Sequence, residues 1–361
     1  MNKRKRAFIF IIILLLVVSG CSSPNEAEDE ENSSTLEATS IIVPSLKLNE
    51  EYYRGVVPYK SSPINGMLRE IPTRLDNKYF EMGLIELAKN NYSPSNYIFQ
   101  EGQILTMNEI EPLLDPNQYP QYENFVYTVT EHNYLFEDGQ YGGVVIGLLV
   151  SPRYYLKNEN GEYIRNSNGA RVVEYYTEEE MNEKSKQLAN DVVSLVRKKD
   201  PNVSITVGVM KAQTRDLKLP GTFFLTGKTG EKDKDSLEWK GINETYLFLP
   251  TDLRIEDENA DTIKIFNYFK GEMEEYLPGY AGITGMARVV NGNLIEITIK
   301  SLAEFDSTSE AIQYTQFAAS RIKKYFPEET HVNFYVNTID RPRALYVRDS
   351  DGKDYMHIYR D

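Results

Sequence analysis

Apolar residues recur at two spacings along this chain, and these spacings predict its helices and strands. Over residues 77–89 and 177–199 they recur every three or four positions, which is typical of amphipathic helices. Thr177 and Glu180 form a capping box at the start of the longer segment, and Asp200-Pro201 ends it. Two further helices are predicted, a short one over 108–114 and another over 310–325.

Shorter runs rich in β-branched and aromatic residues predict strands. They cover residues 125–129, 144–150, 203–210, 222–225, 294–300, 331–337 and 344–347. Two Asn-Gly turns lie between residues 154 and 173, so this stretch is predicted to be a hairpin insertion.

The order strand, helix, strand, strand occurs twice along the chain. At a fixed offset of 129 residues, Leu188 aligns with Phe317 and Val203 with Val332. Identity between the copies is low, and a generic α+β pattern could produce the same agreement. We therefore expect an α+β fold of two related strand-helix-strand-strand units, with mostly antiparallel sheets and helices on one face, preceded by a small helical N-terminal region.

The chain divides into four predicted parts. Residues 1–20 carry four positive charges among the first six residues, then an apolar run over 7–18, which is typical of a secretory signal peptide. Twelve residues at about 1.5 Å each reach about 18 Å, short of the roughly 30 Å hydrocarbon core. An acidic, serine-rich tether over 21–48 is expected to be disordered. Two α+β domains, 49–250 and 251–361, complete the prediction.

Cys21 is the only cysteine, and the small residues before it end at Gly20. The segment resembles a bacterial lipobox, although a lone cysteine can also follow an apolar stretch by chance. The resemblance implies cleavage between Gly20 and Cys21 by lipoprotein-processing enzymes and a diacylglycerol on the Cys21 thiol. The protein is then expected on the extracellular face of the cell membrane, held by its lipid anchor. No thiol would remain for a disulfide, a metal site or a nucleophile.

Charge narrows the choice of partners. Without residues 1–20 the chain keeps 36 basic against 54 acidic residues, a formal charge of −18. Such a surface repels nucleic acid and anionic headgroups, so nucleic acid is excluded as a partner and membrane attachment depends on the acyl chains.

No motif predicts catalysis, a metal or a cofactor. Gly221 and Gly227 are separated by five residues where a phosphate-binding P-loop needs four. Residues 349–354 are similar to a calcium loop but lack its final acid, and Asp351-Gly352 favours a hairpin turn. The histidines share no zinc spacing. We therefore predict that the protein is not an enzyme.

The chain as a whole resembles the CamS family of sex-pheromone precursor lipoproteins. The resemblance is carried by Tyr53–Tyr59, Phe80–Leu84, Tyr97–Gln103, Trp239–Glu244, Arg341–Leu345 and His357–Tyr359. It implies a membrane-anchored lipoprotein without known enzymatic activity, and a signal peptide that releases a short apolar pheromone. The family's usual pheromone peptide is not present, but residues 13–20 have similar length and apolar character.

The candidate site residues follow from these segments. We expect a ligand-binding or domain-junction surface that includes Trp239, Asn243, Glu244, Arg341 and Arg343. The folded part is thus predicted to be a binding module for a peptide or cell-wall ligand. The alternative is a cell-wall- or peptide-directed hydrolase whose site is not recognisable in the sequence.

Overall fold

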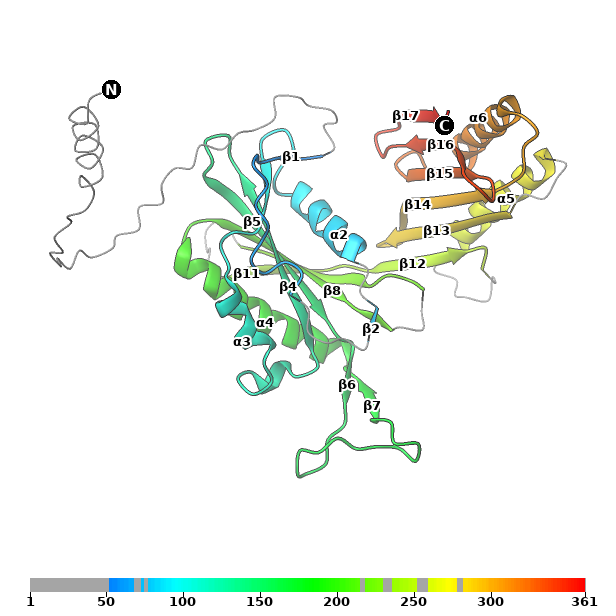
Figure 1. Cartoon of the computed structure of the whole chain (residues 1–361). Coiled ribbons are helices and arrows are strands. Elements are labelled where there is room, and N and C mark those ends of the chain that lie inside the picture. Colours follow the sequence, from blue (N-terminus) through cyan, green and yellow to red (C-terminus); the bar gives the residue numbers. More distant parts are fainter. Residues whose placement is uncertain are drawn as a thin grey trace, which may run out of the picture. The chain divides into compact units, whose positions relative to one another are not determined.

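The structure is a computed structural model that describes residues 52–67, 73–74, 77–214, 218–229, 236–251, 259–277 and 282–360. The predicted signal peptide, Gly20, Cys21 and the tether lie outside the described residues. All the described residues belong to one compact unit. Two large β-sheets account for most of its strands (Figure 1).

The first sheet has seven strands in the order β1-β3-β4-β5-β8-β10-β11. β5 and β8 pair in parallel, as do β1 and β3, and the other neighbours are antiparallel. The strands are β1 (Arg54–Gly55), β3 (Ile98–Glu101), β4 (Val126–Leu135), β5 (Tyr141–Val150), β8 (Ser204–Lys211), β10 (Thr222–Thr229) and β11 (Leu237–Gly241).

The second sheet has six strands in simple sequence order, β12 to β17. β14 and β15 are parallel, and the other neighbours are antiparallel. The strands are β12 (Glu244–Leu249), β13 (Gly282–Val290), β14 (Asn293–Leu302), β15 (His331–Asn337), β16 (Pro342–Arg348) and β17 (Asp354–Ile358). β12 joins this sheet although it precedes residue 250.

The two sheets share one topology. Each unit has six strands, β3 to β11 in the first sheet and β12 to β17 in the second. In both, the third and fourth strands pair in parallel, and the other four pairs of neighbours are antiparallel. A helix follows the first strand of each unit, α3 (Met107–Leu114) or α5 (Ala260–Tyr276). A second helix, α4 (Glu178–Lys199) or α6 (Thr308–Tyr325), connects the parallel pair. The predicted repeat of strand, helix, strand, strand is confirmed, and the repeating unit is longer than predicted.

Local sequence explains where these helices begin. The Thr177 hydroxyl accepts the Glu180 N–H at 3.2 Å, and the Glu180 carboxylate accepts the Thr177 N–H at 2.8 Å. This is the predicted capping box. Ser307 caps α6 through its hydroxyl, which accepts the Glu310 N–H at 3.2 Å.

Helices cover both faces of the first sheet. α3 and α4 pack on one face, where Val144, Ile146 and Leu148 of β5 point. α2 (Asn77–Lys89) packs on the other face. Gly147 permits this packing, since a Cβ there would lie 2.4 Å from Leu84 Cδ1. In the second sheet α5 and α6 pack together on one face.

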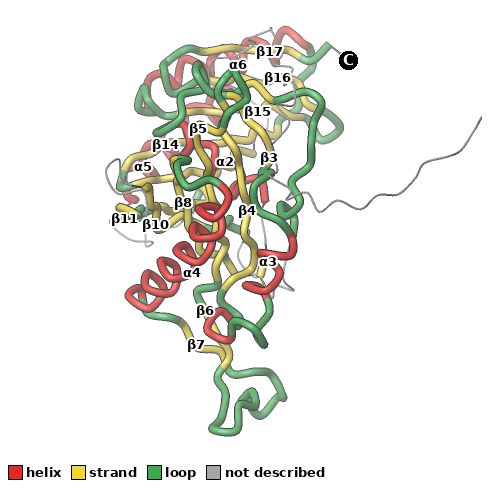
Figure 2. Tube along the Cα trace, turned by 90° about the vertical axis from the view of Figure 1, so that its left-hand side faces the viewer, coloured by secondary structure: helices red, strands yellow, loops and turns green. Residues whose placement is uncertain are grey.

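The insertion between β5 and α4 is a projecting arm. β6 (Arg153–Tyr155) pairs with β7 (Val173–Tyr175), and the arm extends away from the other strands (Figures 1 and 2). Gly161 and Gly169, the turn glycines, have φ of +80° and +78°, which favours glycine at both positions. The predicted hairpin insertion is confirmed.

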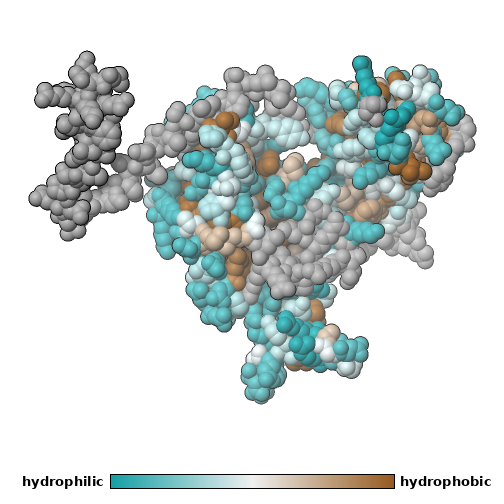
Figure 3. Space-filling view, in the orientation of Figure 1, coloured by the Kyte–Doolittle hydropathy of each residue, from teal (hydrophilic) through white to brown (hydrophobic). Residues whose placement is uncertain are grey.

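The remaining elements are short. β2 (Thr73–Arg74) pairs with β9 (Gln213–Thr214), and a 3-10 helix covers Pro120–Tyr122. Among the described residues no helix is both long and apolar enough to cross a membrane. On the face shown in Figure 3, the described residues are mostly hydrophilic, with smaller hydrophobic patches between them.

Candidate functional site

A groove of about 620 Å³ lies where the two sheets adjoin. α2, β10, β11, β12 and β13 contribute its walls. Its apolar lining comprises Leu87, Phe223, Ile242, Val290 and Ile295. Its charged lining comprises Glu86, Lys228, Glu238, Lys240, Glu244 and Arg288. We call it the junction groove.

Arg288 organises the charges at the base of the junction groove. Its Nε lies 2.5 Å from Glu244 Oε1, and its Nη1 lies 2.5 Å from Glu86 Oε2. The second oxygen of Glu244 accepts the backbone N–H of Phe223. Because these groups come from β13, β12, α2 and β10, the cluster ties the two sheets together.

Burial and neighbouring charges shift the pKa values of these groups. The Glu244 side chain is 1% exposed, and burial raises its pKa although the Arg288 charge opposes the rise. Burial works against the charge of Arg288, but Glu86 and Glu244 raise its pKa, so it stays protonated. Burial also raises the pKa of Tyr246, which keeps its hydroxyl neutral. The cluster can hold charge in place, but among the described residues it contains no nucleophile beside a free base.

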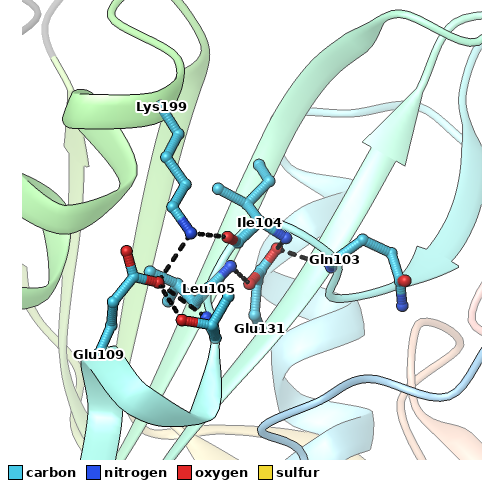
Figure 4. Close-up of polar contacts among 7 residues, drawn as sticks. Gln103, Ile104, Leu105, Glu109, Glu131 and Lys199 are labelled. Atoms are coloured by element: carbon cyan, nitrogen blue, oxygen red, sulfur yellow. Dashed lines mark hydrogen bonds and ion pairs between the residues drawn. The ribbon is translucent and has the colours of Figure 1, made fainter. Parts of the chain in front are cut away.

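A second buried carboxylate belongs to Glu131 on β4 (Figure 4). It accepts the backbone N–H groups of Gln103, Ile104 and Leu105 at 3.1, 2.9 and 2.8 Å. Asn133 Nδ2 donates a further bond at 2.6 Å. Burial raises the Glu131 pKa, and these donors oppose the rise. Because its oxygens are occupied by the 103–105 backbone, Glu131 anchors a loop and is not available to a substrate.

The histidines form no common site. Burial lowers the pKa of His132 to about 4, and its Nδ1 has no hydrogen-bond partner among the described residues. His331 Nδ1 lies 3.6 Å from Asp349 Oδ1, and His357 Nδ1 lies 3.2 Å from the Tyr355 hydroxyl. Within the described ranges no group of His, Cys, Asp and Glu side chains could hold a metal ion.

The two sequence patterns that are similar to a P-loop and to a calcium loop form ordinary secondary structure. Thr222–Thr229, which contains the P-loop-like glycine and lysine, is strand β10. Residues 349–354 form the β16–β17 hairpin turn, where Gly352 has φ of +82°. A strand and a hairpin turn therefore account for the two sequence patterns that are similar to ligand loops.

Only part of the predicted ligand surface comes together. Glu244 lines the junction groove, and Asn243 lies at its rim, where its N–H donates to Asn291 Oδ1 at 3.1 Å. Trp239 is on the adjacent strand β11 but faces the other way. Its indole lies over Gly227, where a Cβ would come within 2.8 Å of the ring.

Trp239 instead lines a second cavity of about 670 Å³ between α4 and β11. We call this the α4 cavity. Arg341 and Arg343 lie near the β15–β16 turn and line neither cavity. Arg341 Nε lies 3.7 Å from Asp340 Oδ2. Glu86 and Arg288 were not predicted, because single acidic and basic residues on a helix and a strand carry no distinguishing sequence signal.

The fold and the groove define a mixed α+β protein built from two units of the same topology, with a charged cluster at their junction. The chain belongs to the CamS sex pheromone cAM373 precursor family, whose profile matches residues 59–354. Comparison with curated protein sequences finds no significant match.

Solved structures show the same fold. One is a sex pheromone precursor from Lactobacillus salivarius subsp. salivarius UCC118, with a TM-score of 0.72 and 22% identity. The match covers 89% of this chain and 99% of that one. Another is the C-terminal domain of the sex pheromone staph-cAM373 precursor from Staphylococcus aureus, with a TM-score of 0.62 and 21% identity over 79% of this chain and 96% of that one.

Proposed function

We propose that this protein is a lipoprotein anchored by Cys21 to the extracellular face of the cell membrane. Its two α+β domains, predicted as 49–250 and 251–361 although β12 joins the second sheet, form a non-enzymatic binding module for a peptide or a cell-wall fragment. The observation that supports a binding role is the junction groove, where an apolar lining adjoins charges that already pair with one another. Such a site can bury a ligand but offers no activated nucleophile among the described residues.

Membrane attachment is tested by changing Cys21 to Ser. The wild-type protein is expected to partition with membranes, because two or more acyl chains give a stable hold. The Cys21→Ser variant should be released or remain as uncut precursor. Fractionation followed by detection of the folded domain distinguishes these states, and unchanged membrane retention of the variant would contradict the proposed anchor.

Ligand binding is tested by isothermal titration calorimetry, because Trp239, the only tryptophan of the chain, faces the α4 cavity and not the junction groove. Peptides and peptidoglycan fragments are titrated into the purified protein. Saturable binding without turnover is expected. Turnover of a fragment, abolished by a single carboxylate or histidine substitution, would identify a hydrolase instead.

The signal peptide is proposed to release a short apolar peptide from residues 13–20. Each buried Leu or Ile side chain contributes about 2 kcal/mol to capture by an apolar receptor pocket, before the cost of ordering the peptide. Exchange of similar aliphatic residues changes binding by only about 1–3 kcal/mol. Synthetic Ile13–Gly20 and Leu14–Gly20 should therefore give weak or altered aggregation of plasmid-bearing responder cells. Potency equal to the usual family peptide would contradict this specificity argument.

A further inference from the structure

Strand β11 is a free edge of the first sheet. It pairs with β10 and with no other strand among the described residues. Ile242 N–H donates to Phe224 C=O at 2.9 Å, in register with the β10–β11 ladder. Bonded pairs alternate along an antiparallel ladder, so Glu238 and Lys240 also occupy bonded positions. The N–H and C=O groups of Leu237, Trp239 and Gly241 consequently point away from β10.

A cavity lies on each face of this edge strand. Glu238 and Lys240 line the junction groove, whereas Leu237 and Trp239 line the α4 cavity. Successive side chains of a strand point to opposite faces of a sheet. We propose that β11 accepts an extended peptide as an additional strand, whose side chains enter the two cavities in alternation. This proposal rests on the proposed binding role and specifies how the ligand is held.

The length of β11 sets the size of the recognised segment. Five residues at about 3.3 Å each span about 17 Å, enough to pair with a segment of about five residues. Main-chain hydrogen bonds to the outward groups of Leu237, Trp239 and Gly241 supply affinity that depends little on sequence. The two cavities determine which side chains of the peptide are accepted.

The lining of the α4 cavity selects acidic side chains. Lys198 and Arg197 come from the last turn of α4, where Arg197 Nη1 already donates to the Val203 C=O at 2.6 Å. No aspartate or glutamate lines this cavity among the described residues. Lys198 is exposed, and the cavity thus offers positive charge in a protein whose overall charge is strongly negative. Ser194 and Asn190 add polar groups beside the Trp239 ring.

The lining of the junction groove carries no net charge and therefore favours aliphatic side chains. Ile242, Val290 and Phe223 provide apolar surface, and the charged lining balances three acidic against three basic residues: Glu86, Glu238 and Glu244 against Lys228, Lys240 and Arg288. The ligand is therefore an extended peptide in which acidic and aliphatic residues alternate. Opposite residues of an antiparallel pair share a face, so acidic residues lie opposite Leu237 and Trp239.

The first experiment compares N-methylated peptides. The probe is the blocked heptapeptide Asp-Val-Asp-Val-Asp-Val-Asp, titrated into the full-length protein in detergent while Trp239 fluorescence is followed. One peptide is N-methylated on its central Asp amides and another on its Val amides. Alternate residues of the added strand direct their N–H groups toward β11, so either the Asp amides or the Val amides form the hydrogen bonds. Methylation of the amides that face β11 should weaken binding about tenfold or more, whereas methylation of the other amides should weaken it less than about twofold. If the peptide adds antiparallel to β11, the peptide methylated on its Asp amides should bind more weakly. If it adds parallel, the peptide methylated on its Val amides should bind more weakly.

The second experiment changes β11 itself. Gly241→Pro removes an outward N–H without removing a bond to β10, and it should weaken probe binding about tenfold. Gly241→Ala is the matched control, because a Cβ at this position meets nothing within 4 Å and the N–H is kept. Lys198→Glu should weaken the acidic probe about fivefold or more, whereas Lys300→Glu on β14 should not.

The outcomes separate this proposal from the binding role on which it rests. Equal binding of both N-methylated peptides, equal binding by Gly241→Pro and Gly241→Ala, or no probe binding at about 1 mM would overturn strand addition. Peptidoglycan fragments that bind Gly241→Pro and wild type equally would leave the binding role intact. Failure of every peptide and fragment to bind wild type would overturn both.

Discussion

Replacement of Glu131 by alanine should destabilise the first unit more than the loss of any exposed carboxylate there. Glu131 is fully buried, and its side chain accepts three consecutive backbone N–H groups, from Gln103 to Leu105. Alanine leaves the Ile104 and Leu105 N–H groups and Asn133 Nδ2 without this buried acceptor, whereas the Gln103 N–H keeps Asn133 Oδ1 at 2.8 Å. The loop between β3 and α3 then loses its attachment to the Glu131 side chain of β4 (Figure 4).

The expected loss in the free energy of unfolding follows from the number of buried hydrogen-bond donors that lose their acceptor. Each buried donor left unpaired costs about 1–3 kcal/mol. Relief of carboxylate burial and local relaxation offset part of the sum, so Glu131→Ala should lower the free energy of unfolding by about 3–5 kcal/mol. Glu131→Gln keeps one carbonyl acceptor but turns an amide donor toward the remaining N–H. We expect an intermediate loss of about 1–2 kcal/mol.

Urea unfolding, followed by circular dichroism and by Trp239 fluorescence, measures these losses. Glu137→Ala is the control, because the Glu137 side chain is 76% exposed and its ion pair with Arg54 contributes at most about 1 kcal/mol. Glu131→Ala is expected to be the most destabilising variant, followed by Glu131→Gln and then by the control. A Glu131→Ala loss below about 1 kcal/mol, or equal to that of the control, would refute the anchoring role.

The pH dependence provides a second readout. Burial raises the folded-state pKa of Glu131 above its ordinary value, so the folded state binds the proton more tightly than the unfolded state. The associated stability is fully present below the ordinary glutamate pKa and is lost as the pH rises through the folded pKa. The stability difference between wild type and Glu131→Gln should therefore be larger near pH 4 than at pH 7.

Two further variants test the junction and the buried histidine. Arg288→Met leaves the buried Glu244 carboxylate unpaired and should lower the free energy of unfolding by about 3 kcal/mol or more. Glu86→Gln, at a side chain that is 38% exposed, should lower it by about 1 kcal/mol or less. Equal losses of the two variants in urea unfolding would contradict the organising role of Arg288. The depressed pKa of His132, about 4 against about 6.5 unfolded, gives stability that is present above pH 6.5 and lost as the pH falls to 4. His132→Gln should remove up to about 3 kcal/mol of this acid-dependent loss, and an unchanged pH profile of unfolding would show that His132 does not titrate as a buried group.

The sequence predicted the elements that are specified by residues close together in the chain, such as capping residues, turn residues and short periodic runs. The capping box at Thr177, the Asn-Gly turns of the arm and the helix over 310–325 each depend on residues a few positions apart. Repetition of these local patterns also indicated two related units. β12, α5 and β13 were missed, although Ile263, Phe266, Phe269 and Met273 repeat at helical spacing and could have identified α5.

The sequence by itself thus determined the α+β class, the order of most elements and, through the segment around Cys21, a prediction of lipid anchoring. Tertiary structure alone decided which side chains meet. Glu86 and Arg288 are 202 positions apart, and Trp239 and Glu244, five positions apart, face different cavities. The physical reason is that local periodicity sets which face of an element is buried, whereas the partner of that face depends on close packing between segments that are far apart in the chain.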